Sequence, residues 1–184
     1  MTTPATALDL SAAAQPPRVA LFVDTQNLYY AARDAGSAVN YETLLATAAN
    51  GRALAHATAY VVERDGEATA YSFVGKLNAL GFRVRRRKVR VHRVNDDGVP
   101  VMEGDWDMGI AADIVRSLEH VDVVALASGD GDFVPILELA QERGKRVEVL
   151  AFRDATSQAL QDLADRFVAL GEVEGMFLPP RAHV

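Results

Sequence analysis

The sequence predicts one three-layer α/β/α domain with a mostly parallel central sheet. Short, continuous apolar runs recur along the chain, and helical stretches separate them. Such runs are typical of parallel strands, because helices cover both faces of a parallel sheet. The 184 residues are enough for one sizeable core, and 49% hydrophobic with 24% charged residues is an ordinary globular composition.

The predicted strands and helices alternate along the chain. The apolar runs predict strands at residues 19–24, 57–62, 121–127 and 146–151. Helices are predicted at residues 41–49, 66–80, 107–119, 133–143 and 157–165. Each interval between strands is long enough for the crossover helix that parallel neighbours require.

The segment between Gly81 and Gly104 breaks this rhythm. Valines are interleaved there with Arg and Lys, and residues 95–98, Asn-Asp-Asp-Gly, offer turn chemistry. We therefore expect a strand with a basic hairpin extension.

The ends of the chain differ in composition from the rest. Residues 1–17 are rich in Ala, Thr and Pro and end in a Pro pair, which predicts a disordered N-terminal arm. The domain is predicted over residues 18–178, with a C-terminal tail at residues 179–184.

Composition also excludes several classes of protein. A formal net charge of −6 argues against a surface that binds nucleic acid by bulk charge, so such contact requires a local patch. The chain has no cysteine, which excludes disulfides, thiolate zinc sites and a Cys nucleophile and suits a reducing compartment. No apolar run approaches the ~18 residues of a membrane span, so we expect a soluble, cytoplasmic protein without membrane contact.

Carboxylates follow three separate segments of the predicted fold. Asp24 ends the first strand, Asp130 and Asp132 lie in a Gly-rich turn after the strand at 121–127, and Asp107 lies in the first turn of its helix. Loops at the carboxyl ends of parallel strands share one crevice, where ligands usually bind. The sequence therefore predicts an acidic crevice at this edge.

Close carboxylates resist joint ionisation unless a cation lies among them. Hard oxygen ligands without His or Cys fit Mg²⁺ or Mn²⁺, and the matching reaction is phosphodiester hydrolysis. We predict Asp24, Asp107 and Asp130 as metal ligands and catalytic residues, with Asn27 and Asp132 supporting them.

Weaker candidates and structural alternatives stand beside this prediction. Asp105, Ser128 and Trp106 are candidates for support, with Trp106 as a base-stacking side chain at the crevice mouth. Solvation is the more common role for a residue such as Asp105, and Asp24 and Asp132 could simply cap the segments that follow them.

The run from residue 83 to residue 93 is the dense positive cluster of an otherwise acidic chain. It predicts contacts with an RNA backbone, and an edge strand protected by charge is the alternative. The candidate RNA-binding residues are Arg85, Arg86, Arg87, Lys88, Arg90 and Arg93.

Three blocks of sequence resemble the NYN domain family, a PIN-like nuclease group that includes the LabA-type proteins. Residues 22–28, FVDTQNL, resemble the FVD-x-x-N-L opening, and residues 128–135, SGDGDFVP, resemble its SGDGDF-x-P-L block. Residues 103–107, EGDWD, with the later Asp113, are similar to its KG-x-x-D stretch.

The resemblance implies a PIN-like, Rossmann-like fold and metal-dependent RNA cleavage. Asp24, Asp107 and Asp130 occupy the family's acidic positions, with Asn27 and Asp132 beside them. Glu103 stands where the family has Lys, which removes a cation near the expected phosphate site.

These observations favour a Mg²⁺- or Mn²⁺-dependent endoribonuclease acting on single-stranded RNA. The alternative is a non-catalytic RNA- or protein-binding regulatory module with the same fold. The oligomeric state stays open, and a homodimer is one alternative.

Overall fold

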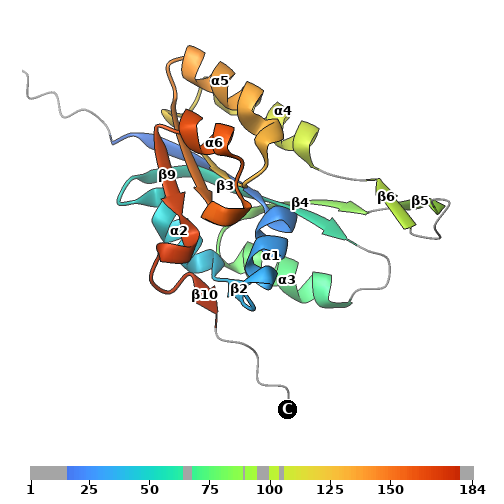
Figure 1. The fold of residues 1–184 in the computed structure, drawn as a ribbon. Helices are drawn as coiled ribbons and strands as arrows, with labels where there is room; N and C mark the ends of the chain where they lie inside the picture. Colours follow the sequence, from blue (N-terminus) through green and yellow to red (C-terminus); the bar gives the residue numbers. More distant parts are fainter. Residues whose placement is uncertain (1–15, 64–67, 89, 95–99, 104–105, 179–184) are drawn as a thin grey trace, which may run out of the picture.

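A six-stranded sheet forms the centre of the computed structural model (Figure 1). The structure describes residues 16–63, 68–88, 90–94, 100–103 and 106–178. The strand order is β4-β3-β1-β7-β8-β9, and every neighbouring pair is parallel. The strands are β1 (Arg18–Asp24), β3 (Ala53–Glu63), β4 (Arg83–Lys88), β7 (Val123–Ala127), β8 (Arg146–Ala151) and β9 (Arg166–Ala169).

Helices cover both faces of this sheet (Figure 1). Alternate residues of β1 point to opposite faces, so that Leu21 packs with one group of helices and Phe22 with the other. One layer contains α1 (Thr25–Asp34), α2 (Tyr41–Ala49) and α3 (Ala68–Ala79). The other contains α4 (Asp107–Ser117), α5 (Val134–Glu142) and α6 (Gln158–Leu163).

Two small antiparallel sheets and three 3₁₀ turns complete the described structure. β2 (Ala38–Val39) pairs with β10 (Phe177–Leu178), and β5 (Arg90–Val94) pairs with β6 (Pro100–Glu103) in a hairpin that projects from the domain (Figure 1). The 3₁₀ turns are η1 (Gly131–Phe133), η2 (Arg153–Ala155) and η3 (Leu170–Glu172).

The predicted α/β architecture is confirmed. All four predicted strands form, the helix at 41–49 matches α2, and the basic segment forms β4 followed by a hairpin. The sequence prediction omitted α1, β9 and the short β2–β10 pair. The predicted arm, apart from residues 16 and 17, and the predicted tail lie outside the described residues. Nowhere in the described ranges is a helix both long and apolar enough to span a bilayer.

Candidate active site

Asp24 lies where β1 ends and α1 begins. Its Oδ1 accepts hydrogen bonds from the backbone N–H groups of Gln26 at 3.1 Å and Asn27 at 3.0 Å, so the carboxylate caps α1. Ser128 Oγ donates to its Oδ2 at 3.4 Å. Burial raises the pKa of Asp24, and the nearby charge of Asp130 adds to this, against the lowering effect of the backbone hydrogen bonds.

Asp130 and Asp132 lie in the turn that joins β7 to α5. Asp130 Oδ1 accepts the N–H of Asp132 at 3.0 Å and caps η1. The backbone N–H of Asp130 donates in turn to Ser128 Oγ at 3.2 Å. The N-cap of α5 is Phe133, so the alternative that Asp132 caps this helix is wrong.

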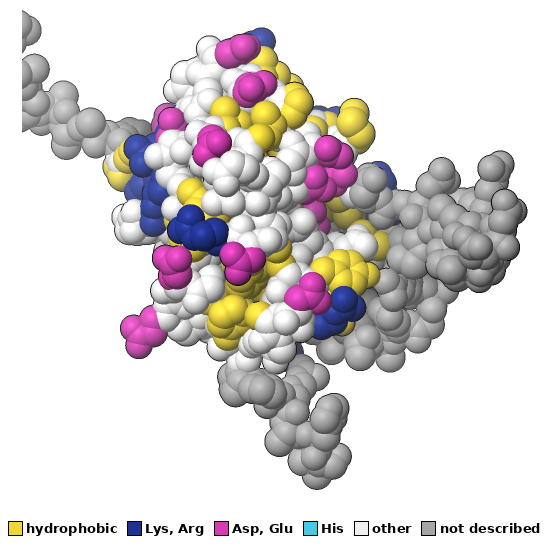
Figure 2. Space-filling model, in the orientation of Figure 1, with side chains coloured by type: hydrophobic (Ala, Val, Ile, Leu, Met, Phe, Trp, Pro, Cys, Tyr) yellow, Lys and Arg dark blue, Asp and Glu magenta, His cyan; other side chains and the backbone are white. Residues whose placement is uncertain are grey.

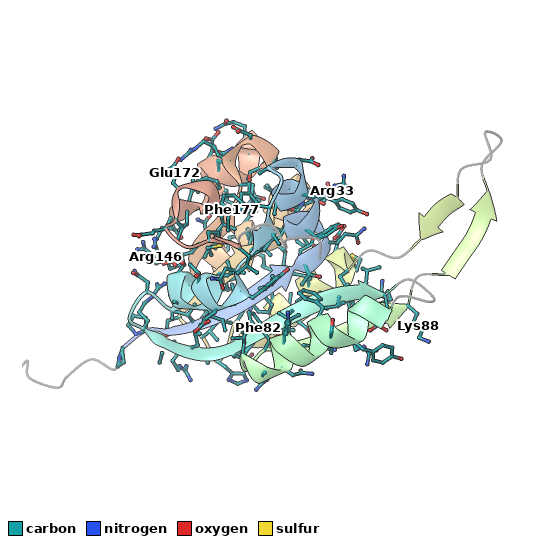
Figure 3. All side chains as sticks on the ribbon, turned by 90° about the horizontal axis from the view of Figure 1, so that it is seen from below. Arg33, Phe82, Lys88, Arg146, Glu172 and Phe177 are labelled. Atoms are coloured by element: carbon teal, nitrogen blue, oxygen red, sulfur yellow. The ribbon has the colours of Figure 1, made fainter. Side chains whose placement is uncertain are left out.

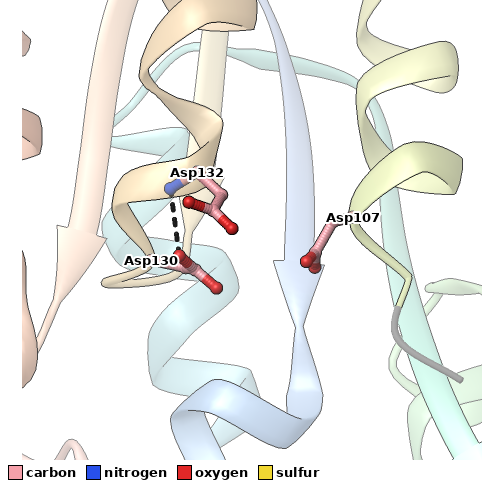
Figure 4. Close-up of side chains that lie close together, drawn as sticks. All are labelled: Asp107, Asp130 and Asp132. Atoms are coloured by element: carbon pink, nitrogen blue, oxygen red, sulfur yellow. Dashed lines mark hydrogen bonds between the residues drawn. The ribbon is translucent and has the colours of Figure 1, made fainter. Parts of the chain in front are cut away.

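Asp107 opens α4 and faces this turn (Figure 4). Carboxylate oxygens of Asp107, Asp130 and Asp132 all lie within 4.8 Å of one another, and we call these three residues the acidic cluster. The sequence predicted a trio in which Asp24 took the place of Asp132. Asp24 instead lies beside the cluster, bonded through Ser128 to the same turn.

The turn after β7 is held by close contact with other segments. Asn27 Oδ1 accepts the N–H of Gly129 at 2.9 Å, which fastens the first turn of α1 to it. The N–H of Ser157 donates to the Gly129 carbonyl at 3.0 Å. A Cβ on Gly129 would collide with the backbone carbonyl of Ala155. Asn27 and buried Ser128 thus hold the turn that carries Asp130 and Asp132 in place.

Trp106 precedes Asp107 and is braced in three ways. Its Nε1 donates to the carbonyl of Val61 at 3.1 Å, and its ring meets the Tyr60 ring edge-on with centroids 5.4 Å apart. The guanidinium of Arg87 lies over the ring, 4.6 Å from its centroid. Arg87 therefore covers one face of the Trp106 ring, and the predicted base stacking by this side chain stays a prediction. Asp105 lies outside the described residues.

The predicted RNA-binding residues differ in their surroundings. Arg85 pairs with Asp113 at 2.7 Å, and Arg86 pairs with Glu63. Lys88 is exposed. β4 is an edge strand of the sheet, as the alternative reading expected. For Arg90 and Arg93 only the backbone is described, within β5.

Asp113 is a buried carboxylate whose role the sequence only partly indicated. It pairs with Arg116 at 2.8 Å, accepts a hydrogen bond from the Tyr60 hydroxyl at 2.9 Å and pairs with Arg85. Burial and the bond to Asp113 raise the pKa of Tyr60. The Asp113 contacts fasten α4, and with it Asp107, to β3 and β4.

The comparison with protein families identifies the fold type. The family model of the NYN domain matches residues 18–171. The chain belongs to the NYN domain family. NYN domains are PIN-like, nuclease-type domains, so the predicted family and fold class are confirmed.

Individual relatives agree with this membership. The chain is similar to the low amplitude and bright protein LabA of Synechococcus elongatus, with 26% identity over 162 residues, covering 86% of this chain and 87% of LabA. It is 35% identical over 74 residues to an uncharacterised protein of Methanocaldococcus jannaschii, covering 39% of this chain and 31% of that protein. The crystal structure of a protein of unknown function from Vibrio parahaemolyticus matches with TM-score 0.78 and 33% identity, over 89% of this chain and 98% of that one.

The acidic cluster of this NYN domain fits a hard divalent cation. Its donor atoms are carboxylate oxygens, the ligand type that Mg²⁺ and Mn²⁺ prefer. Their mutual distances allow one small ion to reach all three side chains.

Proposed function

We propose that this NYN domain is a Mg²⁺- or Mn²⁺-dependent endoribonuclease. The observation that carries the proposal is the acidic cluster, in which α4 and the turn after β7 bring three carboxylates within 4.8 Å. Asp107 and Asp130 are the proposed ligands that the sequence already indicated, and Asp132 joins them. Asp24 stays in the proposed site because it shares Ser128 with the acidic turn and lies close enough to Asp130 for the charge of Asp130 to help raise the pKa of Asp24.

In such a site, some residues would bind the metal ion and others would hold those ligands in position. A bound divalent ion supplies charge for the scissile phosphate and lowers the pKa of a bound water. Asn27 and Ser128 hold the turn that carries Asp130, and the Asp113 contacts hold the helix that carries Asp107. Pre-organised ligands cost no rearrangement when a substrate arrives.

The proposed substrate is single-stranded RNA, and the proposed contacts to its backbone come from the basic strand and hairpin. The proposed contacts are Arg85, Arg86, Arg87, Lys88, Arg90 and Arg93. The guanidinium groups of Arg85 and Arg86 also pair with carboxylates, so RNA phosphate would compete with these partners.

Cleavage of labelled single-stranded RNA with Mn²⁺, Mg²⁺ or EDTA tests the proposal. We expect metal-dependent cleavage by the wild type and a loss of about 100-fold or more in Asp107→Asn and Asp130→Asn, since each removes a ligand. Asp34→Asn, a matched change on the exposed end of α1, should cleave normally.

Two outcomes would count against the nuclease. Cleavage that survives both substitutions would come from a contaminating enzyme. Absence of cleavage by clean wild-type protein that still binds RNA would favour the non-catalytic module.

A further inference from the structure

Tyr29 of α1 is 58% exposed, although its side of the helix is anchored to the sheet. Residues four apart lie on one side of a helix, so Thr25, Tyr29 and Arg33 share a side of α1. Thr25 is buried and donates to the carbonyl of Tyr60 at 2.6 Å, which turns this side of α1 toward β3. The Tyr29 ring therefore lies one turn beyond a fixed contact with β3 and is open to solvent.

The opposite side of α1 faces the acidic turn. Asn27 lies two residues before Tyr29, about 160° away around the helix. It accepts the N–H of Gly129 at 2.9 Å. In the sheet order β4-β3-β1-β7, the helix that follows β1 thus lies between the basic strand β4 and the turn that carries Asp130 and Asp132. An RNA strand that contacts both β4 and the acidic cluster would cross α1.

The side of α1 that carries Tyr29 lies at the end of the molecule where the basic strand finishes. Figure 3 shows Arg33 of α1 and Lys88 of β4 at the same end of the molecule, away from Arg146. Arg33 is one turn after Tyr29 on the same side of the helix. The exposed ring is therefore close to the path that RNA would take from β4 to the acidic cluster.

Neighbouring side chains brace the Tyr29 ring. The ring meets that of Tyr30 edge-on, with centroids 5.4 Å apart and an interplanar angle of 67°. The guanidinium of Arg33 lies over the Tyr30 ring at 4.9 Å. A braced tyrosine offers a large, rigid surface at little cost in conformational entropy. Such rings stack on nucleic-acid bases of any sequence, because every base has a π-face.

We propose that the Tyr29 ring stacks on an unpaired base of RNA between the basic strand and the acidic cluster, and that this contact makes the protein prefer single strands to duplexes. The bases of a duplex are paired and stacked on one another, so they cannot stack on the ring. This inference rests on the proposed ribonuclease function and names the residue that would recognise the single strand.

Binding of labelled RNA to the full chain in EDTA, followed by fluorescence anisotropy at several salt concentrations, tests the contact. We expect Tyr29→Leu to bind a single-stranded oligoribonucleotide about 10-fold more weakly, as for the loss of one stacked base. The slope of log affinity against log salt should stay unchanged, because no phosphate contact is lost. Tyr29→Phe keeps the ring and should bind like the wild type. Circular dichroism would verify that both variants fold.

Two further RNA probes show whether the base is what the ring contacts. An abasic strand and a duplex should each bind Tyr29→Leu as tightly as they bind the wild type. A 2-aminopurine base in the single strand should lose emission on binding the wild type and Tyr29→Phe, but not on binding Tyr29→Leu.

Tyr71 provides a matched control. It is a tyrosine of α3 that is 69% exposed, and the guanidinium of Arg86 lies over its ring at 5.2 Å. Tyr71→Leu should therefore act through Arg86, a proposed phosphate contact, and change the binding of normal and abasic strands equally.

The outcomes separate this inference from the nuclease proposal. Unchanged single-strand binding in Tyr29→Leu, or an equal loss on the abasic strand, would overturn the stacking role. An equal base-dependent loss in Tyr71→Leu would overturn its assignment to Tyr29. A base-dependent loss in Tyr29→Leu, in a protein that does not cleave RNA, would support the stacking and refute only the nuclease. Metal-dependent cleavage with no effect of Tyr29→Leu on binding would refute only the stacking.

Discussion

Carboxylates have opposite surroundings at the two ends of the central parallel strands. We call these ends the amino edge and the carboxyl edge of the sheet. Near the amino edge, Glu148 is 1% exposed and pairs with Arg52 at 2.7 Å, Arg146 at 3.1 Å and Arg166 at 3.2 Å. At the carboxyl edge, three aspartates lie together. Among the residues that the structure describes, neither Asp130 nor Asp132 forms an ion pair. In Figure 2, one group of Lys and Arg side chains lies at the left of the molecule and one group of Asp and Glu side chains at its right, while other charged side chains of both signs are scattered over the visible face.

The pKa values follow this difference. Burial alone would raise the pKa of Glu148, but the hydrogen bonds and charge of Arg52, with Arg166, hold it below its ordinary value. Burial raises the pKa of Asp24, and Asp130 adds to the effect. At the amino edge, arginines of the chain itself balance the charge of Glu148. At the carboxyl edge, three aspartates lie together, and a cation from solution would stabilise their negative charge. One edge thus stabilises the fold, and the other is suited to binding.

Glu148→Gln should produce the largest loss of stability. It leaves three guanidinium groups around a neutral amide in a buried site, and breaking such a network costs about 3 kcal/mol of unfolding free energy. Urea denaturation at neutral pH measures this, while RNA cleavage by the folded variant should persist.

The matched control is Glu172→Gln, which removes an exposed ion pair with Arg153. Exposed pairs contribute about 1 kcal/mol or less, so this variant should unfold near the wild-type midpoint. Equal effects of the two substitutions would remove the contrast between a buried network and a surface pair.

Gly129→Ala should show that the carboxyl edge is held by backbone packing. The new Cβ would collide with the Ala155 carbonyl and lie 3.0 Å from the Thr156 Cα, and these backbone atoms move only with the whole segment. Overpacking of this kind costs about 2 kcal/mol, and displacement of the turn should also weaken Mn²⁺ binding. Calorimetry and Mn²⁺ titration would measure both. Gly171→Ala, whose nearest neighbour is 4.0 Å away, should change neither.

The sequence predicted where in the sheet the site lies better than it predicted which carboxylates form it. The rule that parallel strands collect ligands at their carboxyl ends brought Asp107 and Asp130 together correctly. Which third carboxylate joins them depends on side-chain direction, and Asp24 turns toward the α1 backbone as its cap. The sequence did not indicate the contacts of Asp113 with Tyr60 and Arg85, because these partners come from strands distant in sequence.

The omitted elements have equally local causes. No loop separates β1 from α1, since Asp24 ends one element and caps the next, so no turn signal marked the helix. β9 has only four residues and closely follows α6, which the predicted helix at 157–165 overran. Long apolar strands and helices are readable from periodicity, whereas short elements joined without loops are not.

Acidification should abolish the stabilising effect of Glu148. A carboxylate with a lowered folded-state pKa contributes fully above its unfolded pKa, near 4.5, and loses that contribution as the pH falls through the folded value. The difference in unfolding free energy between wild type and Glu148→Gln should therefore stay constant from pH 7 to about 5 and narrow below 4.5. Urea denaturation across this range measures it. A difference that persists unchanged at pH 3 would mean that charge is not the source of the stability.

Asp130→Asn should slightly increase the free energy of unfolding, whereas Glu148→Gln should decrease it. In EDTA it removes one of three neighbouring negative charges while Asn keeps an oxygen to accept the Asp132 N–H, so stability should rise by about 0.5 kcal/mol. Added Mn²⁺ should raise the melting temperature of the wild type by mass action and leave that of the variant nearly unchanged. Thermal melts with and without Mn²⁺ measure both effects. A clear loss of stability in EDTA, like that expected for Glu148→Gln, would show that the acidic cluster serves the fold rather than a bound ion.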